Sequence, residues 1–116
     1  MLITSGNSIK AQGGASMNSI ISGIYQIKNI VSGKIYIGSS VNILHRWEIH
    51  KSDLNNNKHH SIVLQRAWNK YGAGAFEFSI LETCFIFALI FREQYYIDKL
   101  NPKYNMSKKS GERPRY

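Results

Sequence analysis

A β-hairpin built on two short strand-like segments constrains this chain more than any other feature. Residues 22–29 and 34–39 are rich in Ile and Tyr and resemble two strands, and a four-residue loop separates them. Gly33 closes that loop and can adopt the left-handed backbone conformation that such a turn often needs. A loop of this length pairs Asn29 with Lys34, and this pair sets the register of the whole hairpin.

The register decides which side chains share a face. Tyr25 and Tyr36, eleven residues apart in the chain, become diagonal neighbours on one face, about 7 to 8 Å apart. Ile24, Ile35 and Ile37 then line the opposite face, where we expect them to supply core. The hairpin therefore predicts two phenols on one side of a sheet and apolar packing on the other.

The composition limits the classes of fold and partner. A chain of 116 residues forms one domain at most, with a single modest core. Its formal net charge of +8 favours polyanions, nucleic acid ahead of an acidic membrane surface, although a merely basic soluble protein carries the same charge. Cys84 is the single cysteine, so an internal disulfide and a cysteine-rich zinc cluster are excluded and an intracellular setting is expected.

The domain boundaries follow from local composition. Residues 1–20 are polar and rich in small side chains, so we expect an N-terminal extension outside the fold and no secretory signal. Residues 21–106 form the expected domain, and residues 107–116 read as a flexible basic tail. The longest apolar run, residues 84–91, is far shorter than the roughly 20 residues that cross a bilayer, so no membrane association is expected.

A first helix is predicted directly after the hairpin. Asn42 is a suitable N-cap, and the helix extends to about residue 54. Its inward stripe is expected to consist of Ile43, Leu44 and Trp47. Arg46 and His50 are four residues apart and therefore lie together on another face of this helix.

Two more helices and a third strand complete the predicted elements. Ser61 can cap a second helix that ends at Gly72, with an inward stripe of Leu64, Ala67, Trp68 and Tyr71. Residues 76–80 alternate as a strand does, and a last helix runs from about residue 85 to residue 100, where Pro102 prevents its continuation.

Glu93 is the most informative single residue of that last helix. It falls on an apolar stripe formed by Leu89, Ile90, Tyr96, Ile97 and Leu100. A carboxylate buried there costs several kcal/mol unless a cation, a metal or hydrogen-bond donors compensate it. The structural alternative is a salt bridge, either to Arg46 of the same chain or to Arg92 of a neighbouring copy.

The ordered motifs resemble the catalytic domain of GIY-YIG endonucleases, and in particular the intron-encoded homing endonucleases. The resemblance covers about residues 22–106 with every motif in order: the segments 22–29 and 34–39, Arg46-Trp47, His50, Arg92-Glu93-Gln94-Tyr95-Tyr96-Ile97 and Asn101-Pro102-Lys103-Tyr104-Asn105-Met106. It implies an α/β (α+β) fold with a small three-stranded antiparallel sheet flanked by helices. It also implies a metal-dependent endonuclease that hydrolyses the phosphodiester bonds of double-stranded DNA.

The resemblance assigns roles that the residue chemistry supports. Glu93 would hold one Mg²⁺ or Mn²⁺, because Mg²⁺ keeps several waters and takes further oxygens from the substrate. Arg46 would bind the scissile phosphate through its fixed fork of donors. Tyr25 or Tyr36 would be the general base, and Tyr25 is slightly preferred. A phenol is mostly neutral at pH 7, so cationic neighbours are needed, and Lys34 is expected to share the face of Tyr36.

The histidines and Asn105 complete the implied site. His50 would contact phosphate or shuttle a proton, and His59 matches a second histidine of the homing enzymes. His60 is expected to face solvent, and four histidines without matched carboxylates or thiols do not make a zinc site. Asn105 would support the site by hydrogen bonds, with a plain turn role as its alternative.

The sequence departs from the family pattern in two places. Residues 85–91 are almost entirely apolar, so this helix start must be buried or must contact a partner or a further segment. We expect no recognition module in residues 107–116, so sequence specificity would require a separate DNA-recognition domain. A repair-type or non-specific nuclease of the same fold, and a non-catalytic basic DNA-binding module, are the alternatives. An intron-borne gene would allow a mitochondrial or other organellar location.

Overall fold

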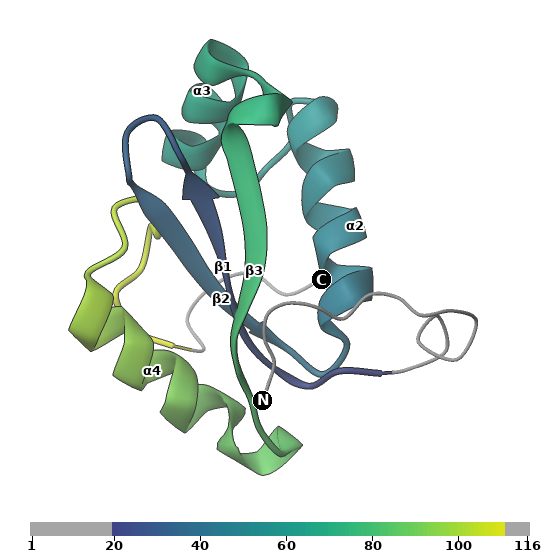
Figure 1. Cartoon of the computed structure of the whole chain (residues 1–116), viewed down its shortest axis with the longest axis vertical. Coiled ribbons are helices and arrows are strands. Elements are labelled where there is room, and N and C mark those ends of the chain that lie inside the picture. Colours follow the sequence, from purple (N-terminus) through teal and green to yellow (C-terminus); the bar gives the residue numbers. More distant parts are fainter. Residues whose placement is uncertain (1–19, 111–116) are drawn as a thin grey trace.

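A computed structural model describes residues 20–110 (Figure 1). Three strands form one antiparallel sheet in the order β2-β1-β3, namely β1 (Gly23–Asn29), β2 (Ile35–Ser40) and β3 (Phe76–Thr83). The helices are α2 (Ile43–Asn55), α3 (Ile62–Tyr71) and α4 (Leu89–Leu100), with short 3₁₀ turns η2 (Ala73–Ala75) and η3 (Ile86–Ala88). The expected sheet and flanking helices are confirmed. The predicted N-terminal extension, up to residue 19, and the tail from residue 111 lie outside the described residues.

The hairpin has the predicted register. Tyr36 of β2 pairs with Ile27 of β1, and Tyr25 pairs with Gly38. Gly33 has φ +81°, the left-handed conformation that the four-residue loop requires. β1 is the central strand, so the tyrosine it carries is enclosed by strands on both sides.

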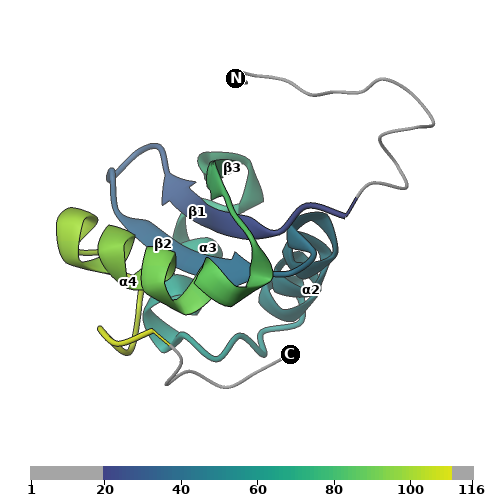
Figure 2. The ribbon, with the colours of Figure 1, turned by 90° about the horizontal axis from the view of Figure 1, so that it is seen from below.

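Each face of the sheet has its own core, and helices cover both faces, as the view from below shows (Figure 2). Tyr25 and Tyr36 lie in the larger cluster, which also contains residues of α2 and α3. Ile24 and Ile37 face the other way and pack with Ile97 of α4, with Ile35 against them. The predicted division of the hairpin into a tyrosine face and an isoleucine face is confirmed.

The two predicted helix caps are present. The Asn42 side chain accepts a hydrogen bond from the His45 amide at 3.3 Å, and Ser61 accepts one from the Leu64 amide at 3.1 Å. Within α2, Ile43 is buried but Leu44 is exposed, so the prediction that Leu44 faces inward was wrong. His50 and Leu54 continue the buried stripe of α2 in its place, because they follow Ile43 at helical spacing.

The structure changes the limits of the last two predicted elements. β3 continues past residue 80 to Thr83, and the last helix begins at Leu89 instead of near residue 85. Phe85 has an extended backbone (φ −67°, ψ 154°), and the η3 turn follows it before α4 begins. No side chain caps the start of α4. Ile90 and Leu100 are exposed, contrary to the predicted stripe, whereas Glu93 and Ile97 are buried as expected.

An ion pair ties α4 to the edge strand β3. Arg92 Nε and Nη2 donate to the two carboxylate oxygens of Glu82, each at 2.8 Å, and Tyr96 Oη donates to Oε1 at 2.8 Å. These bonds, Arg92 first, lower the pKa of Glu82 below its ordinary value. Within its own chain Arg92 is thus engaged with Glu82. An ion pair between Glu93 and Arg92 of a neighbouring copy stays a prediction.

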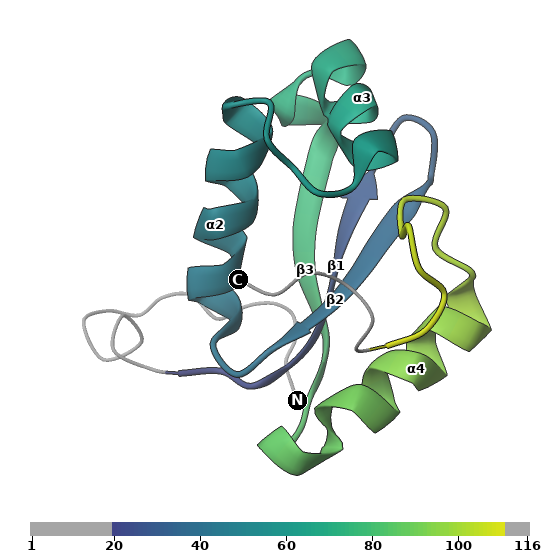
Figure 3. The same cartoon turned by 180° about the vertical axis from the view of Figure 1, so that it is seen from behind.

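The segment that follows α4 runs back along β2, as the view from behind shows (Figure 3). The Tyr104 amide donates to the Ile35 carbonyl at 3.0 Å, which adds one bond to the open edge of β2. Residues 107–110, which were expected to belong to the flexible tail, then contact α4. Gln94 Nε2 donates to the Lys108 carbonyl at 3.0 Å, and the Ser110 amide donates to Gln94 Oε1 at 2.7 Å.

The apolar start of the last helical region stays at the surface. Its exposed side chains are Phe85, Ile86, Phe87, Ile90 and Phe91. The rings of Phe85 and Phe87 stack on each other at 5.5 Å. Within the described part of the chain, no helix is long and apolar enough to cross a membrane.

Candidate active site

A chain of hydrogen bonds connects a strand, a helix and a loop on the tyrosine face of the sheet. Tyr25 Oη of β1 lies 2.6 Å from His50 Nε2 of α2. His50 Nδ1 lies 2.8 Å from Nε2 of His59, in the loop before α3. The Ser61 amide donates to His59 Nδ1 at 3.0 Å. All four residues are buried, so this chain is shielded from water. We call it the Tyr25 relay.

The backbone of Ser61 sets the direction of every bond in the relay. An N–H group can only donate, so His59 Nδ1 is an acceptor and neutral His59 carries its proton on Nε2. That proton points to His50 Nδ1, which must accept, and neutral His50 therefore carries its own proton on Nε2. The last bond then runs from His50 Nε2 to the oxygen of Tyr25. Tyr25 is the acceptor at the end of the relay.

Burial keeps His59 neutral. Its pKa falls from 6.5 to about 3, first because burial disfavours the charged ring and then because His60 repels it. The ring planes of His59 and His60 stack with centroids 4.5 Å apart. At neutral pH His59 therefore has the single proton on which the direction of the relay depends.

Tyr36 has a different imidazole partner. Its Oη lies 3.1 Å from His60 Nε2, and His60 is half-buried. The prediction that His60 faces solvent was wrong, because the loop before α3 turns its ring toward the sheet. Lys34, expected to provide charge beside Tyr36, is exposed, and the groups against Tyr36 are the rings of His50, His59 and His60.

Glu93 lies at the opposite end of the β-hairpin from its turn and is 1 % exposed. Its Oε1 accepts a bond from Ser39 Oγ at 2.9 Å and another from Ser110 Oγ at 2.7 Å. Ser39 is on β2, and Ser110 belongs to the segment that returns to α4. Hydroxyl donors thus compensate part of the cost of burying the carboxylate.

Ser39 also brings Arg46 to the same place. Arg46 Nη1 of α2 donates to the Ser39 carbonyl at 3.5 Å, while the Ser39 hydroxyl binds Glu93. One residue of β2 is therefore in contact with the predicted phosphate ligand and with the predicted metal ligand. Ser39 was not predicted as a site residue, although it is the last residue of the second strand segment, 34–39.

Asn105 is part of the support predicted for the site. Its Oδ1 accepts a bond from the Ile37 amide and its Nδ2 donates to the Ile37 carbonyl, both at 2.9 Å. Ile37 lies between Tyr36 and Gly38 on the edge strand, so Asn105 takes the place of a neighbouring strand. The hydrogen-bonding role was expected, whereas its target, the backbone of β2, was not.

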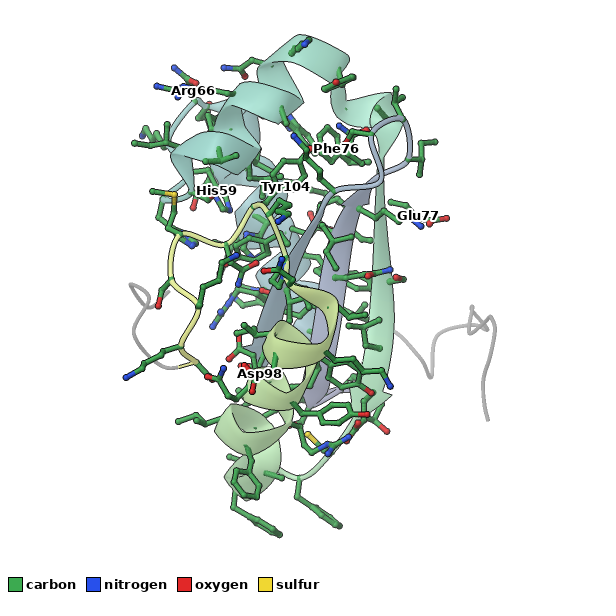
Figure 4. All side chains as sticks on the ribbon, turned by 90° about the vertical axis from the view of Figure 1, so that its left-hand side faces the viewer. His59, Arg66, Phe76, Glu77, Asp98 and Tyr104 are labelled. Atoms are coloured by element: carbon green, nitrogen blue, oxygen red, sulfur yellow. The ribbon has the colours of Figure 1, made fainter. Side chains whose placement is uncertain are left out.

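Two further residues belong to the support and were not predicted. Gln65 of α3 accepts from the His59 amide at 3.0 Å and donates to the Leu54 carbonyl at 2.9 Å. The Ser61 hydroxyl donates to the Tyr104 carbonyl at 2.6 Å. Figure 4 shows His59 and Tyr104 between α3 and the sheet. Only the spacing from the Ser61 cap could have hinted that Gln65 turns inward.

The residues present fit one divalent ion at Glu93. Among residues 20–110, no group of three or more His, Cys, Asp or Glu side chains could hold a metal by itself. A single carboxylate with neighbouring hydroxyls suits Mg²⁺, which takes oxygen ligands and keeps several waters. Such an ion would have Glu93 as its carboxylate ligand and would take its other oxygens from water and substrate.

Comparisons with known proteins identify the family and the fold. A family model described as the GIY-YIG catalytic domain matches residues 21–105. A point mutant of the catalytic domain of intron endonuclease I-TevI has a solved structure that superposes with a TM-score of 0.72 at 42% identity, over 77% of this chain and 96% of that one. The structure of the catalytic domain of homing endonuclease I-TevI superposes with a TM-score of 0.69 at 44% identity, over 74% and 98%.

A curated relative is longer than the matched segment. Intron-associated endonuclease 1 of Enterobacteria phage T4 is 46% identical over 86 residues. The match covers 72% of this chain and 35% of the relative, so the chain spans about a third of the relative's length. The family model, the shared fold and the ordered motifs concur, and the chain belongs to the GIY-YIG catalytic domain family.

Proposed function

We propose that the protein is a metal-dependent DNA endonuclease, the catalytic domain of an intron-encoded homing endonuclease. The observation that carries this proposal is the joint placement of the Tyr25 relay and of Glu93 and Arg46, both in contact with Ser39. These are the groups that phosphodiester hydrolysis needs: a base, a cation for the phosphate and a carboxylate for a metal. They occur in a chain of a nuclease family.

Tyr25 is the proposed general base. A hydrogen bond from His50 to its oxygen stabilises the phenolate, since hydrogen bonding to a charged form favours that form. The phenolate takes a proton from the attacking water, the water oxygen bonds to phosphorus, and the bond from phosphorus to the leaving sugar oxygen breaks. His50 is fully buried between Tyr25 and His59, which favours the proton-handling role over the phosphate contact among its two predicted roles.

Arg46 and Glu93 are proposed to stabilise the negative charge of the scissile phosphate, Arg46 directly and Glu93 through a bound metal ion. Arg46 binds a non-bridging oxygen of the scissile phosphate through its guanidinium N–H groups. Glu93 would hold a divalent ion, Mg²⁺ or Mn²⁺, which would supply Lewis-acid stabilisation of the charge on the phosphate and on the leaving oxygen. Ser39 holds Glu93 by a hydrogen bond and so orients its carboxylate toward the substrate.

The proposed substrate is double-stranded DNA. A separate DNA-recognition domain is part of the proposal. The match covers only 35% of intron-associated endonuclease 1, so that relative has about twice as much sequence again outside the matched segment. An organellar location stays a prediction, since that relative belongs to a bacteriophage. A repair-type nuclease would instead cut damaged or arbitrary DNA, and a binding module would not cut.

Cleavage of supercoiled plasmid tests the proposal. Purified protein is incubated with Mg²⁺, Mn²⁺ or EDTA, and the same reactions are run with Glu93→Gln and Arg46→Ala after their circular dichroism and DNA binding have been matched to the parent. We expect metal-dependent nicking that both substitutions reduce at least about 100-fold. Absence of nicking by the parent, even when a known DNA-binding domain is fused to its C-terminus, would contradict the proposal.

A further inference from the structure

A cavity of about 200 Å³ lies between the hairpin turn and α3. It is separate from the Tyr25 relay and from Glu93, and its lining residues are Ser32, Lys34, Val63, Arg66, Ala67, Lys70, Tyr71 and Tyr104. Three of these side chains are cationic, and no lining residue is acidic. Figure 4 shows Arg66 on the outer surface of α3, above His59 and Tyr104.

The three cations have no acidic partner in the described part of the chain. Arg66 and Lys70 are four residues apart on α3, where like charges repel each other. Lys34 approaches the same cavity from the hairpin, and none of the three takes part in an ion pair within residues 20–110. Lys70 Nζ lies 5.3 Å from the ring centroid of Tyr71, which positions it at the rim. Three uncompensated positive charges around one hollow suit an anion.

The cavity and the candidate active site lie along the same edge of the sheet. Lys34 precedes the first residue of β2, and Ser39 is near its last. Five residues of strand cover about 17 Å, and one strand of duplex DNA presents a phosphate about every 3.4 Å of helix axis. Tyr104 lines the cavity while its neighbour Asn105 binds Ile37 on the outer edge of β2. A duplex lying along this edge would reach both places.

We propose that this cavity binds the phosphate backbone of the DNA substrate about five nucleotides from the scissile bond, through Lys34, Arg66 and Lys70. The inference rests on the proposed function and deepens it. The contact is independent of base sequence, because the cavity offers charges and hydroxyls to phosphate oxygens. Its role is to hold and orient the duplex, and it takes no part in the chemical step.

The test measures the salt dependence of binding to a 20-base-pair duplex of arbitrary sequence in EDTA, where no metal-dependent cutting occurs. A triple variant, Lys34→Gln, Arg66→Gln and Lys70→Gln, is compared with the parent chain. The control is a triple variant of equal charge change at exposed lysines outside the cavity: Lys51→Gln, Lys99→Gln and Lys103→Gln. Glutamine keeps the helix propensity of the replaced residues.

We expect the slope of log K against log salt to fall by about 2 to 3 for the cavity variant, at about 0.9 per phosphate contact, and by less than 1 for the control. Equal changes in the two variants would overturn the proposal.

Acetylation of the unsubstituted chain provides a second measurement that needs no variant to fold. Saturating duplex should protect Lys34 and Lys70 but leave Lys51 and Lys99 reactive, and unchanged reactivity of Lys34 and Lys70 would also overturn it.

The two proposals fail in different ways. If the parent nicks plasmid and binds duplex but the cavity variant behaves like the control, only the cavity proposal is contradicted. A parent that neither nicks plasmid nor binds duplex contradicts the proposed function, and the cavity proposal fails with it.

Discussion

His50 Nε2 donates a hydrogen bond to the hydroxyl oxygen of Tyr25 across 2.6 Å. The direction of this bond is imposed from the other end of the relay, where the Ser61 amide occupies Nδ1 of His59. A backbone group outside the sheet thus decides that Tyr25 accepts. A hydrogen bond of this direction favours the phenolate, the form in which Tyr25 would act as the proposed base.

The tautomers of the relay can be observed directly. We expect nitrogen-15 NMR of histidine-labelled protein at pH 7 to show His50 and His59 both protonated at Nε2 and unprotonated at Nδ1. The exposed ring of His45 on α2 gives the reference signals of a solvated imidazole. Protonation of Nδ1 in either His50 or His59 would reverse the relay and contradict its direction.

The stability of the protein should depend on pH through His59. Its pKa is about 3 when folded and 6.5 when unfolded, so the unfolded chain binds more protons between these values. The contribution of neutral His59 is complete above pH 6.5 and is lost as pH falls toward 3. Between pH 7 and pH 5 we expect the free energy of unfolding to fall by about 2 kcal/mol.

Urea unfolding of the parent and of His59→Gln at both pH values checks this dependence. Glutamine does not titrate, so the variant should lose clearly less stability than the parent over the same interval. Parallel losses in the two proteins would mean that another group titrates in this range.

The two hydrogen bonds between the Asn105 side chain and the Ile37 backbone should stabilise the fold. Asn105→Ala leaves the buried amide and carbonyl of Ile37 without these partners, at an expected cost of about 2 to 4 kcal/mol. Asn105→Asp should be at least as damaging, because it places a carboxylate oxygen against the Ile37 carbonyl. The matched control is Asn56→Ala at an exposed site, with an expected change of at most about 0.5 kcal/mol. Urea midpoints that differ little among the three variants would show that Asn105 is a plain turn residue.

Gly38 should tolerate no side chain. A Cβ at this position would overlap the hydroxyl and the ring of Tyr25, whereas one at Gly74 would meet no atom within 4 Å. Gly38→Ala should therefore displace Tyr25, lower stability by about 1 to 3 kcal/mol and reduce plasmid nicking. Gly74→Ala should behave like the parent in both assays. Normal nicking by folded Gly38→Ala would show that the site does not require the present position of the Tyr25 ring.

Much of the hairpin and of the helix limits was predictable because short-range geometry determines them. The four-residue loop that ends at Gly33 sets the register, and that register places Tyr25 and Tyr36 on one face. Asn42 and Ser61 mark helix starts because their side chains satisfy free amides of the first turn. Glu93 was recognisable because a carboxylate interrupts an apolar stripe.

The contacts that link distant segments were not predictable from local pattern. The ring of His60 reaches Tyr36 because of the path of the loop before α3, which no periodicity describes. Ser39 meets Arg46 and Glu93 only after β2, α2 and α4 have packed. The late start of α4 depends on Phe85 staying extended, although residues 85–91 favour a longer helix on hydrophobicity alone.

The most direct measurement is single-turnover cleavage of a short duplex by Tyr25→Phe and Tyr36→Phe, each fused to the same DNA-binding domain as the parent. If Tyr25 is the base at the end of the relay, Tyr25→Phe should lower the cleavage rate by about 100-fold or more, the usual contribution of a general base. Tyr36→Phe should lower it by a clearly smaller factor. Loss of cleavage in Tyr36→Phe together with a nearly normal rate in Tyr25→Phe would contradict the assignment.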